Sequence, residues 1–192
     1  ARRSSGPALV VGNPRGDLSY AEVEAKEVAE RFGTNPLLGA AATKPEVLSR
    51  LPDASLIHLA THAFFNANNP LDSGIVLADG VLTAREVLHH RLQADLLVLS
   101  ACESGQVGSL SGEELAGLSQ TFLQTGVRSL LVSLWQVNDP ATAALIQAFY
   151  TARQAGADKA LALRQAMTQI QQDLRWTHPY YWGAFVLVGD WD

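Results

Sequence analysis

The sequence predicts an α/β protein with a mostly parallel central sheet covered by helices on both faces. Short apolar runs alternate along the chain with capped segments of helical length, as βαβ units require. The runs Leu96–Leu99 and Leu130–Val132 are apolar at every position, as expected for strands buried on both faces. At 192 residues, the chain has the length of one domain with a sizeable core. We therefore expect a single domain over residues 1–192.

The expected strands are short apolar runs that end at turn-forming residues. They cover Ala8–Val11, Leu37–Leu38, Ser55–Ala60, Asp95–Ser100, Ser129–Leu134 and Tyr181–Val188. A hairpin signal, Asp79-Gly80, joins Gly74–Leu77 to Val81–Leu82. Because ligand sites of open parallel sheets form beyond the carboxyl ends of the strands, the residues that follow each strand are the candidates for function.

The expected helices begin at recognisable capping sequences. Four Ser/Thr-x-x-Glu capping boxes each predict a helix start, and they are Ser19–Glu22, Thr43–Glu46, Thr83–Glu86 and Ser111–Glu114. Asp139 followed by Pro140 predicts the N-cap and first turn of another helix, which ends near Gly156. The last helix is expected over Asp158–Arg175.

Composition excludes several classes of protein. Hydrophobic residues make up 47% of the chain and charged residues 17%, a balance typical of folded globular domains. The formal net charge of −5 argues against a generic attraction to nucleic acid or anionic membrane. No apolar run reaches the roughly 18 residues of a membrane span, and no secretory signal is present. We expect a cytoplasmic protein without nucleic-acid or membrane partners, and the initial Ala1 indicates part of a longer chain.

The single cysteine, Cys102, excludes an internal disulfide and a thiolate metal cage. It follows the strand Asp95–Ser100, and His62 follows the strand Ser55–Ala60. If these strands are adjacent and parallel, the two side chains meet at one edge of the sheet. A histidine there can activate the thiol and protonate a leaving group, which is the arrangement of acyl transfer. The alternative is that Cys102 is a small core residue.

Other chemistries lack the residues they require. His58 lies inside a strand and is interpreted as a core or interface residue, and the remaining histidines have no matching ligand set, so no metal site is predicted. A cysteine phosphatase needs an arginine about six residues after the cysteine, where this chain has Val107-Gly108. There is no CxxC pair, Walker loop or Rossmann glycine signature, so no cofactor is expected.

Several motifs together resemble the CHAT domains, a family of caspase-like cysteine peptidases of the clan shared with separase. The matching segments are Ile57–His62, Leu97–Gly105, Gly112–Glu114, Ser133–Asp139, Ala148–Tyr150 and Tyr181–Gly189. The resemblance implies a caspase-like α/β/α sandwich and a catalytic dyad of His62 and Cys102. It further implies an oxyanion hole formed by the backbone N–H groups of Cys102 and Ala63. Such domains often follow tetratricopeptide repeats at the C-terminus of longer proteins.

The resemblance also implies where a substrate binds. Related folds build the pocket for the P1 side chain from the end of the first strand, the residue two before the cysteine and the segment after the next strand. In this chain these are Asn13, Ser100 and the segment from Trp135 to Asp139, and Asp72 and Ser73 are further candidates. A small, neutral Ser100 and a nearby Asp139 favour a basic or uncharged P1 residue, although Asp139 is equally suited to be a helix N-cap.

The predicted function is therefore a cysteine endopeptidase that cleaves protein or peptide substrates, regulated by attached repeats or a partner. The alternative is a catalytically silent caspase-like module that binds a partner. Candidate interface residues for that alternative are Trp135, Trp176, Trp182 and Trp191, of which Trp182 is also suited to the core.

Overall fold

The computed structural model describes residues 6–64, 66, 68–100, 112–135 and 138–192, and a six-stranded sheet lies at the centre of this part of the chain. The strand order is β2 (Leu37–Leu38), β1 (Ala8–Gly12), β3 (Leu56–Ala60), β7 (Leu96–Leu99), β8 (Ser129–Ser133) and β9 (Phe185–Gly189). The first five are parallel, and β9 is antiparallel to β8. The predicted α/β class with a mostly parallel sheet is confirmed.

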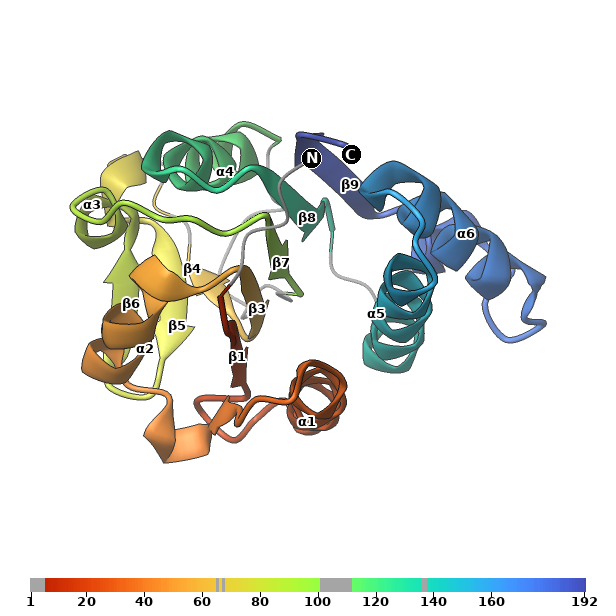
Figure 1. Cartoon of the computed structure of the whole chain (residues 1–192), viewed down its shortest axis with the longest axis horizontal. Coiled ribbons are helices and arrows are strands. Elements are labelled where there is room, and N and C mark those ends of the chain that lie inside the picture. The colour runs from red at the N-terminus through yellow and green to blue at the C-terminus, as the bar shows by residue number, and fades with distance from the viewer. Residues whose placement is uncertain (1–5, 65, 67, 101–111, 136–137) are drawn as a thin grey trace.

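Helices cover both faces of this sheet (Figure 1). One face carries α1 (Ser19–Phe32), α5 (Asp139–Gln154) and α6 (Lys159–Gln172), and the other carries α2 (Lys44–Arg50), α3 (Ala84–Val87) and α4 (Gly112–Thr125). A small antiparallel sheet of β4 (Ala63–Phe64), β5 (Gly74–Leu77) and β6 (Gly80–Thr83) packs on the second face. No helix in the described part of the chain is long and apolar enough to cross a membrane.

Side chains alternate between two hydrophobic cores along each central strand. In β1, Leu9 and Val11 face the core under α2 and α4, whereas Val10 faces the core under α1 and α5. In β3, Ile57 and Leu56 divide between the two cores in the same way. Because both faces are buried, the strands are apolar at consecutive positions, which is the sequence signal that predicted them.

Two of the four predicted capping boxes are wrong. The N-cap of α1 is Leu18 rather than Ser19, and the Leu18 backbone N–H donates to Asn13 Oδ1 at 2.8 Å. Thr43 is the N-cap of α2 but makes no side-chain capping bond, and the Lys44 N–H donates instead to Asp79 Oδ1 at 2.8 Å. In both cases a side chain outside the predicted box, 5 positions away for Asn13 and 35 for Asp79, satisfies the helix N-terminus.

Of the other predicted helix starts, the structure confirms one and shifts another by one residue. Thr83 and Glu86 form the predicted capping box at α3 with both reciprocal bonds, whereas Ser111 lies outside the described residues. The N-cap of α5 is Asn138, whose side chain accepts from the Ala141 N–H, so the prediction of Asp139 as N-cap is wrong by one position. Asp139 is the first residue of the helix, where a carboxylate also suits the helix dipole.

The C-terminal boundaries differ from the prediction for local reasons. Helix α6 ends at Gln172 rather than Arg175, because Asp173 leaves the helical region and its carboxylate binds the Arg175 guanidinium. A 3-10 turn occupies Pro179–Tyr181, so β9 begins at Phe185 rather than Tyr181. Strand β4 forms within a segment that the sequence predicted to be loop.

Candidate active site

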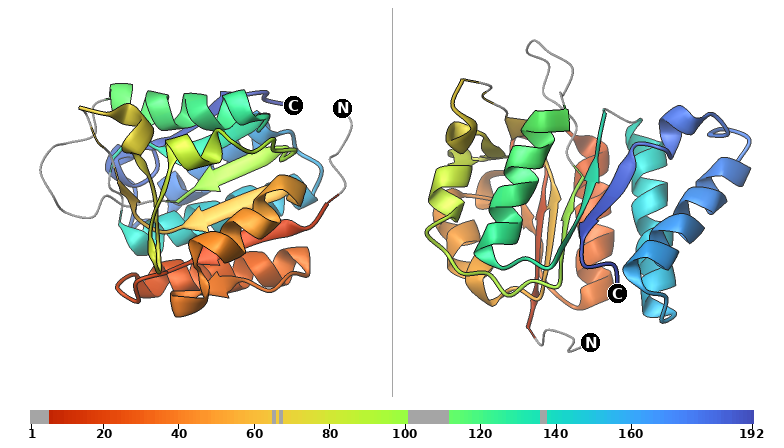
Figure 2. Two further views of the ribbon diagram at one scale, coloured as in Figure 1. Left: turned by 90° about the vertical axis from the view of Figure 1, so that its left-hand side faces the viewer. Right: turned by 90° about the horizontal axis from the view of Figure 1, so that it is seen from above.

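The carboxyl ends of neighbouring parallel strands meet at one edge of the sheet, as Figure 2 shows from the common direction of the arrows. Gly12 at the end of β1 is opposite Ala60 at the end of β3, and the Ser100 N–H beyond β7 donates to Leu59 O at 3.0 Å. The residues that follow, Asn13 and His62, therefore lie at the same edge as Ser100. We call this edge the carboxyl edge.

His62 lies at the carboxyl edge with 8% of its surface exposed. Its Nε2 atom is 3.2 Å from Oδ2 of Asp17, whose side chain is 53% exposed. An ionised carboxylate only accepts hydrogen bonds, so Nε2 carries the proton in this contact. In the neutral imidazole, that assignment makes Nδ1 the nitrogen with the lone pair, and hence the basic atom of His62.

Asp17 is held in place by a tight turn after β1. Asn13 adopts a left-handed conformation with φ of 47°, which asparagine tolerates better than most residues. Its N–H donates to Ala60 O at 2.9 Å, and its Oδ1 accepts from the Leu18 N–H at 2.8 Å. These two bonds tie the turn to β3 and bring Asp17 to His62. Sequence reasoning did not identify Asp17, which in the sequence is only an acidic residue before a helix.

Ala63 follows His62 and begins β4. It pairs with Ile75 in β5, and the adjacent ladder bond runs from Val76 N–H to His62 O at 2.8 Å. This pattern makes Ala63–Ile75 a non-hydrogen-bonded pair, so the Ala63 N–H points away from β5. Among the described residues, Asn13 is the non-glycine residue with a positive φ, so Ala63 has a negative φ and an ordinary backbone conformation.

Cys102 lies outside the described residues, as does the loop from Cys102 to Leu110. Its predicted pairing with His62 and its place in the oxyanion hole therefore stay predictions. In the sequence, a single residue separates Cys102 from Ser100.

The structure brings Ser100 and Asp139 together, although 38 other residues separate them in the sequence. Both line a small pocket beside α1, together with Glu24 and Thr142. Thr142 Oγ1 is buried and has no hydrogen-bond partner within the described part of the chain. Tyr20 also lines the pocket, so its lining residues carry two carboxylates and three hydroxyl groups, and the Glu24 carboxylate contacts His58 at 3.0 Å.

Trp135 follows β8 near the carboxyl edge and is 37% exposed. Its indole Nε1–H donates to Tyr180 O at 3.1 Å, and the neighbouring Leu134 N–H donates to Ala184 O at 2.8 Å. These bonds fix the position of the partly exposed Trp135 side chain. Of the other candidate interface residues, Trp176 and Trp182 pack against the core, and Trp191 is 62% exposed.

Asp72 and Ser73 organise the segment between β4 and β5. The Asp72 carboxylate accepts from Asn69 Nδ2 at 2.5 Å and from Arg85 at 3.2 Å. Ser73 Oγ accepts from the Asn66 N–H at 2.9 Å. Both side chains thus have partners in this segment or in α3, and their predicted contact with substrate stays a prediction.

His58 is buried, as the sequence interpretation held. Its Nε2 is 3.0 Å from Oε1 of Glu24, and its Nδ1 is 3.2 Å from the Tyr150 hydroxyl. The His58–Glu24 contact has an ion-pair distance without the alignment of a hydrogen bond. Burial raises the pKa of Tyr150 well above its usual value of 10. No cluster of three metal-ligating side chains occurs among the residues that the structure describes.

A mostly parallel sheet between two helical layers, with a histidine directly beyond the end of β3, defines a caspase-like α/β domain. Solved structures share this fold. The Saccharomyces cerevisiae separase in its complex with securin has a TM-score of 0.65 at 17% identity, covering 98% of this chain and 12% of that one. The Arg-specific cysteine proteinase gingipain R has a TM-score of 0.60 at 10% identity, covering 98% of this chain and 47% of that one.

The family model of the CHAT domain matches residues 1–190, and the chain belongs to the CHAT family. It is also similar to tetratricopeptide repeat protein 28 of Mus musculus and of Homo sapiens, at 29% identity in each case. These alignments cover 95% and 97% of this chain but 9% of each relative, so the chain spans less than a tenth of the curated relatives it matches.

Proposed function

We propose that this domain is a cysteine endopeptidase in which Cys102 is the nucleophile and His62 is the general base. The observation that carries the proposal is the contact of His62 Nε2 with Asp17, 3.2 Å apart at the carboxyl edge. It makes Nδ1 the basic atom. The neighbouring strand β7 continues in the sequence through Ser100 and Ala101 to Cys102. The proposal places the thiol beside that basic nitrogen.

The proposed reaction is acyl transfer in two stages. The thiol proton moves to His62 Nδ1, and the thiolate attacks the carbonyl carbon of the scissile peptide bond. The carbon–nitrogen bond then breaks, and the imidazolium returns the proton to the leaving amine. In the second stage, His62 takes a proton from water as the hydroxide attacks the thioester carbon. The carbon–sulfur bond then breaks to release the acid, and the imidazolium returns the proton to the leaving thiolate, which restores the thiol.

Two further groups of this chain support the reaction in the proposal. The Ala63 N–H, which points away from β5, donates to the developing oxyanion together with the Cys102 N–H. Asp17 acts as a positioning residue, because its carboxylate holds the ring of His62 and stabilises the imidazolium that forms.

The small pocket lined by Ser100 and Asp139 encloses about 20 Å³ and is the proposed site for the charged end of the P1 side chain, since a whole Lys or Arg side chain is larger than this volume. The Asp139 carboxylate favours a basic side chain through charge pairing and hydrogen bonds. Trp135, which follows β8 and is 37% exposed, is a further proposed contact for the substrate. The proposed substrate is therefore a protein segment with Lys or Arg at P1. We further propose that repeats attached to the domain, or a protein partner, regulate it in the cytoplasm, since the curated relatives are named for tetratricopeptide repeats.

The reactivity of the thiol distinguishes the peptidase from a silent interaction module. Cys102 is the sole cysteine, so every alkylation event of an iodoacetamide probe reports on it. We expect His62→Ala to slow alkylation at pH 7 by about tenfold or more, because the Cys102 thiol loses the base that deprotonates it. His89→Ala, which removes an exposed histidine, is the matched control. Equal and slow rates in all three proteins would favour the silent module.

Cleavage by the full-length protein tests the nucleophile directly. We expect Cys102→Ala to abolish cleavage of a protein substrate and to trap that substrate in a stable complex. Retained cleavage would contradict the proposal. For the P1 pocket, profiling with a peptide library is expected to show that Asp139→Asn weakens the preference for basic P1 by about tenfold. An unchanged profile would remove Asp139 from the pocket.

A further inference from the structure

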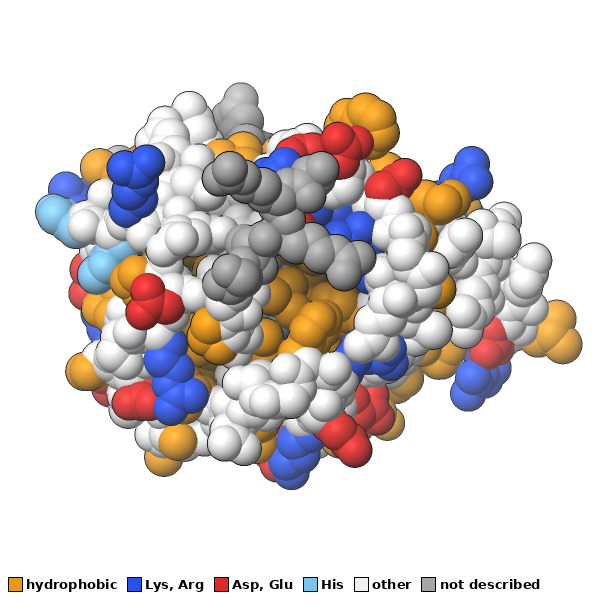
Figure 3. All heavy atoms as spheres, in the orientation of Figure 1, with side chains coloured by type: hydrophobic (Ala, Val, Ile, Leu, Met, Phe, Trp, Pro, Cys, Tyr) orange, Lys and Arg blue, Asp and Glu red, His pale blue; other side chains and the backbone are white. Residues whose placement is uncertain are grey.

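A second concave site lies at the opposite end of the sheet from the carboxyl edge. It encloses about 330 Å³ and opens between α1 and α5, where Ser55 and Asp95 precede β3 and β7. Figure 3 shows this hollow with an apolar floor and basic side chains beside it. Its volume falls at the lower end of the range for small-ligand pockets, about 300–1,000 Å³.

The floor and one wall of this pocket are apolar and aromatic. Leu56 and Leu96 come from adjacent strands, and Phe32 and Tyr150 come from the C-terminal halves of α1 and α5. The two aromatic rings pack edge to face with centroids 5.2 Å apart, and both line the pocket. Flat apolar walls of this kind favour an aromatic ligand, which stacks or packs edge to face against them.

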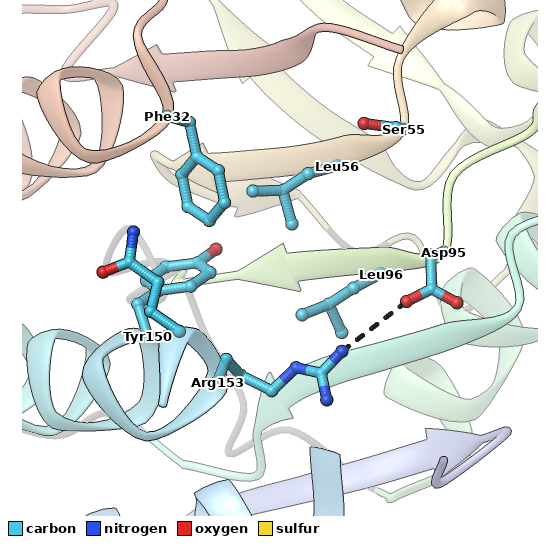
Figure 4. Close-up of a pocket in the computed structure, with 8 residues that line it drawn as sticks. Phe32, Ser55, Leu56, Asp95, Leu96, Tyr150 and Arg153 are labelled. Atoms are coloured by element: carbon cyan, nitrogen blue, oxygen red, sulfur yellow. Dashed lines mark ion pairs between the residues drawn. The ribbon is translucent and has the colours of Figure 1, made fainter. Parts of the chain in front are cut away.

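The opposite wall carries both signs of charge, because Asp95 and Arg153 both line the pocket. The carboxylate of Asp95 is shared by three cations: Lys159 at 3.1 Å, Arg128 at 3.4 Å and Arg153 at 3.9 Å. Arg128 also pairs with Asp190. Arg153 makes the longest of the three contacts, and it extends across the pocket toward Asp95 in Figure 4. Arg153 also donates to Ala157 O at 2.6 Å. A ligand anion can pair with the Arg153 guanidinium while Lys159 and Arg128 stay with Asp95.

We propose that this pocket binds a small aromatic carboxylate, with its ring against Phe32 and Tyr150 and its carboxylate on Arg153. Gln154, which also lines the pocket, supplies a polar group at the rim and is itself held by Arg31 at 2.7 Å. The proposal does not depend on peptidase activity, because none of these residues belongs to the carboxyl edge. Both sites can be occupied at once.

A ligand in the pocket would also contact Tyr150, which connects the pocket to the buried residues behind it. Tyr150 lines the pocket with its ring and contacts His58 with its hydroxyl. Glu24, on the other side of His58, lines the small pocket with Ser100 and Asp139. One continuous set of contacts thus joins the two sites.

Binding is tested by titration calorimetry and ligand-observed NMR with indole-3-acetate as the probe. Indole-3-acetamide has the same ring without the negative charge and is the uncharged control. Acetate has the carboxylate without the ring, and saturable binding of acetate would indicate an adventitious anion only. We expect saturable binding of the acid at one site, at least tenfold weaker binding of the amide, and no saturable binding of acetate. Indole-3-acetate that fails to saturate at millimolar concentration, or an amide that binds equally well, overturns the proposal.

Two variants locate the binding. Arg153→Gln is expected to weaken binding of the acid by about tenfold while leaving the amide unchanged. Gln154→Trp, at an exposed position on the rim, is expected to block both compounds. Arg164→Gln changes an exposed arginine of α6 outside the pocket and is the matched control. Unaltered binding in both pocket variants overturns the assignment of the site.

Discussion

His58 and His62 lie four positions apart in one short segment, and each contacts a carboxylate at close to 3 Å. Their surroundings differ. The carboxylate beside His58 belongs to Glu24 and is 3% exposed, whereas the carboxylate beside His62 belongs to Asp17 and is 53% exposed. His58 is enclosed within the strand, and His62 follows its end.

This difference separates a structural pair from a pair suited to catalysis. In the core, a charge or hydrogen-bonding group that loses its partner cannot turn to water, so the partners of His58 specify the packing. At the carboxyl edge, Asp17 keeps contact with water, and His62 can take up and release protons there without desolvating an isolated charge. The same residue types therefore predict opposite consequences when they are removed.

The largest expected contrast is in stability. We expect His58→Ala to lower the free energy of unfolding by about 3–5 kcal/mol, because Glu24 is left buried without its partner. His62→Ala is expected to cost about 1 kcal/mol, because Asp17 is half exposed. Urea unfolding followed by circular dichroism measures both. His58→Gln, which retains a polar group, serves if His58→Ala fails to fold, and its loss should be intermediate. Similar losses for His58→Ala and His62→Ala would break the comparison.

The second contrast concerns reactivity. We expect Asp17→Asn to slow alkylation of Cys102 about tenfold, equal to about 1.4 kcal/mol, since an amide can present a donor as well as an acceptor to His62. Asp17→Glu should restore most of the rate, because it retains the carboxylate. Asp53→Asn, at another exposed acid, is the control. If Asp17→Asn reacts at the rate of the wild type, Asp17 does not position His62.

The smallest expected effect is on stability and concerns Tyr150, which contacts buried His58. At pH 7, Tyr150→Phe should lower stability by about 1 kcal/mol, because the hydroxyl contact with His58 is lost. Burial raises the pKa of Tyr150 well above 10 in the folded protein. Only the unfolded chain therefore ionises this residue near pH 10, and wild-type stability falls as the pH rises beyond that value, by up to about 1.4 kcal/mol per pH unit.

The phenylalanine variant lacks this ionisation, so its deficit should shrink above pH 10. Urea unfolding at pH 7, 9 and 10.5 measures the trend, and Tyr20→Phe at an exposed position is the control. A deficit that stays constant with pH would show that the Tyr150 hydroxyl is not confined within the core.

Much of the fold was predictable because its signals are local. The apolar run Leu96–Leu99 is confirmed as the buried strand β7, and Thr83 caps α3 through Glu86 as the sequence pattern indicates. The failures occur where a residue outside the local pattern takes the place of the predicted cap. Asp79 caps α2 in place of Thr43, and Asn13 satisfies the start of α1. A capping pattern contains no information about such partners.

For the candidate site, too, some features follow from the local sequence and others depend on the tertiary structure. The sequence by itself determined the fold class, the position of His62 beyond β3 and the family, because hydrophobic periodicity and short motifs are properties of neighbouring residues. Only the tertiary structure decided that Asp17 contacts His62, that His58 contacts Tyr150, and that Ser100 and Asp139 share a pocket. The first two contacts join residues 45 and 92 positions apart. Their formation depends on the register of the strands and the packing of α1 and α5, which no local pattern specifies.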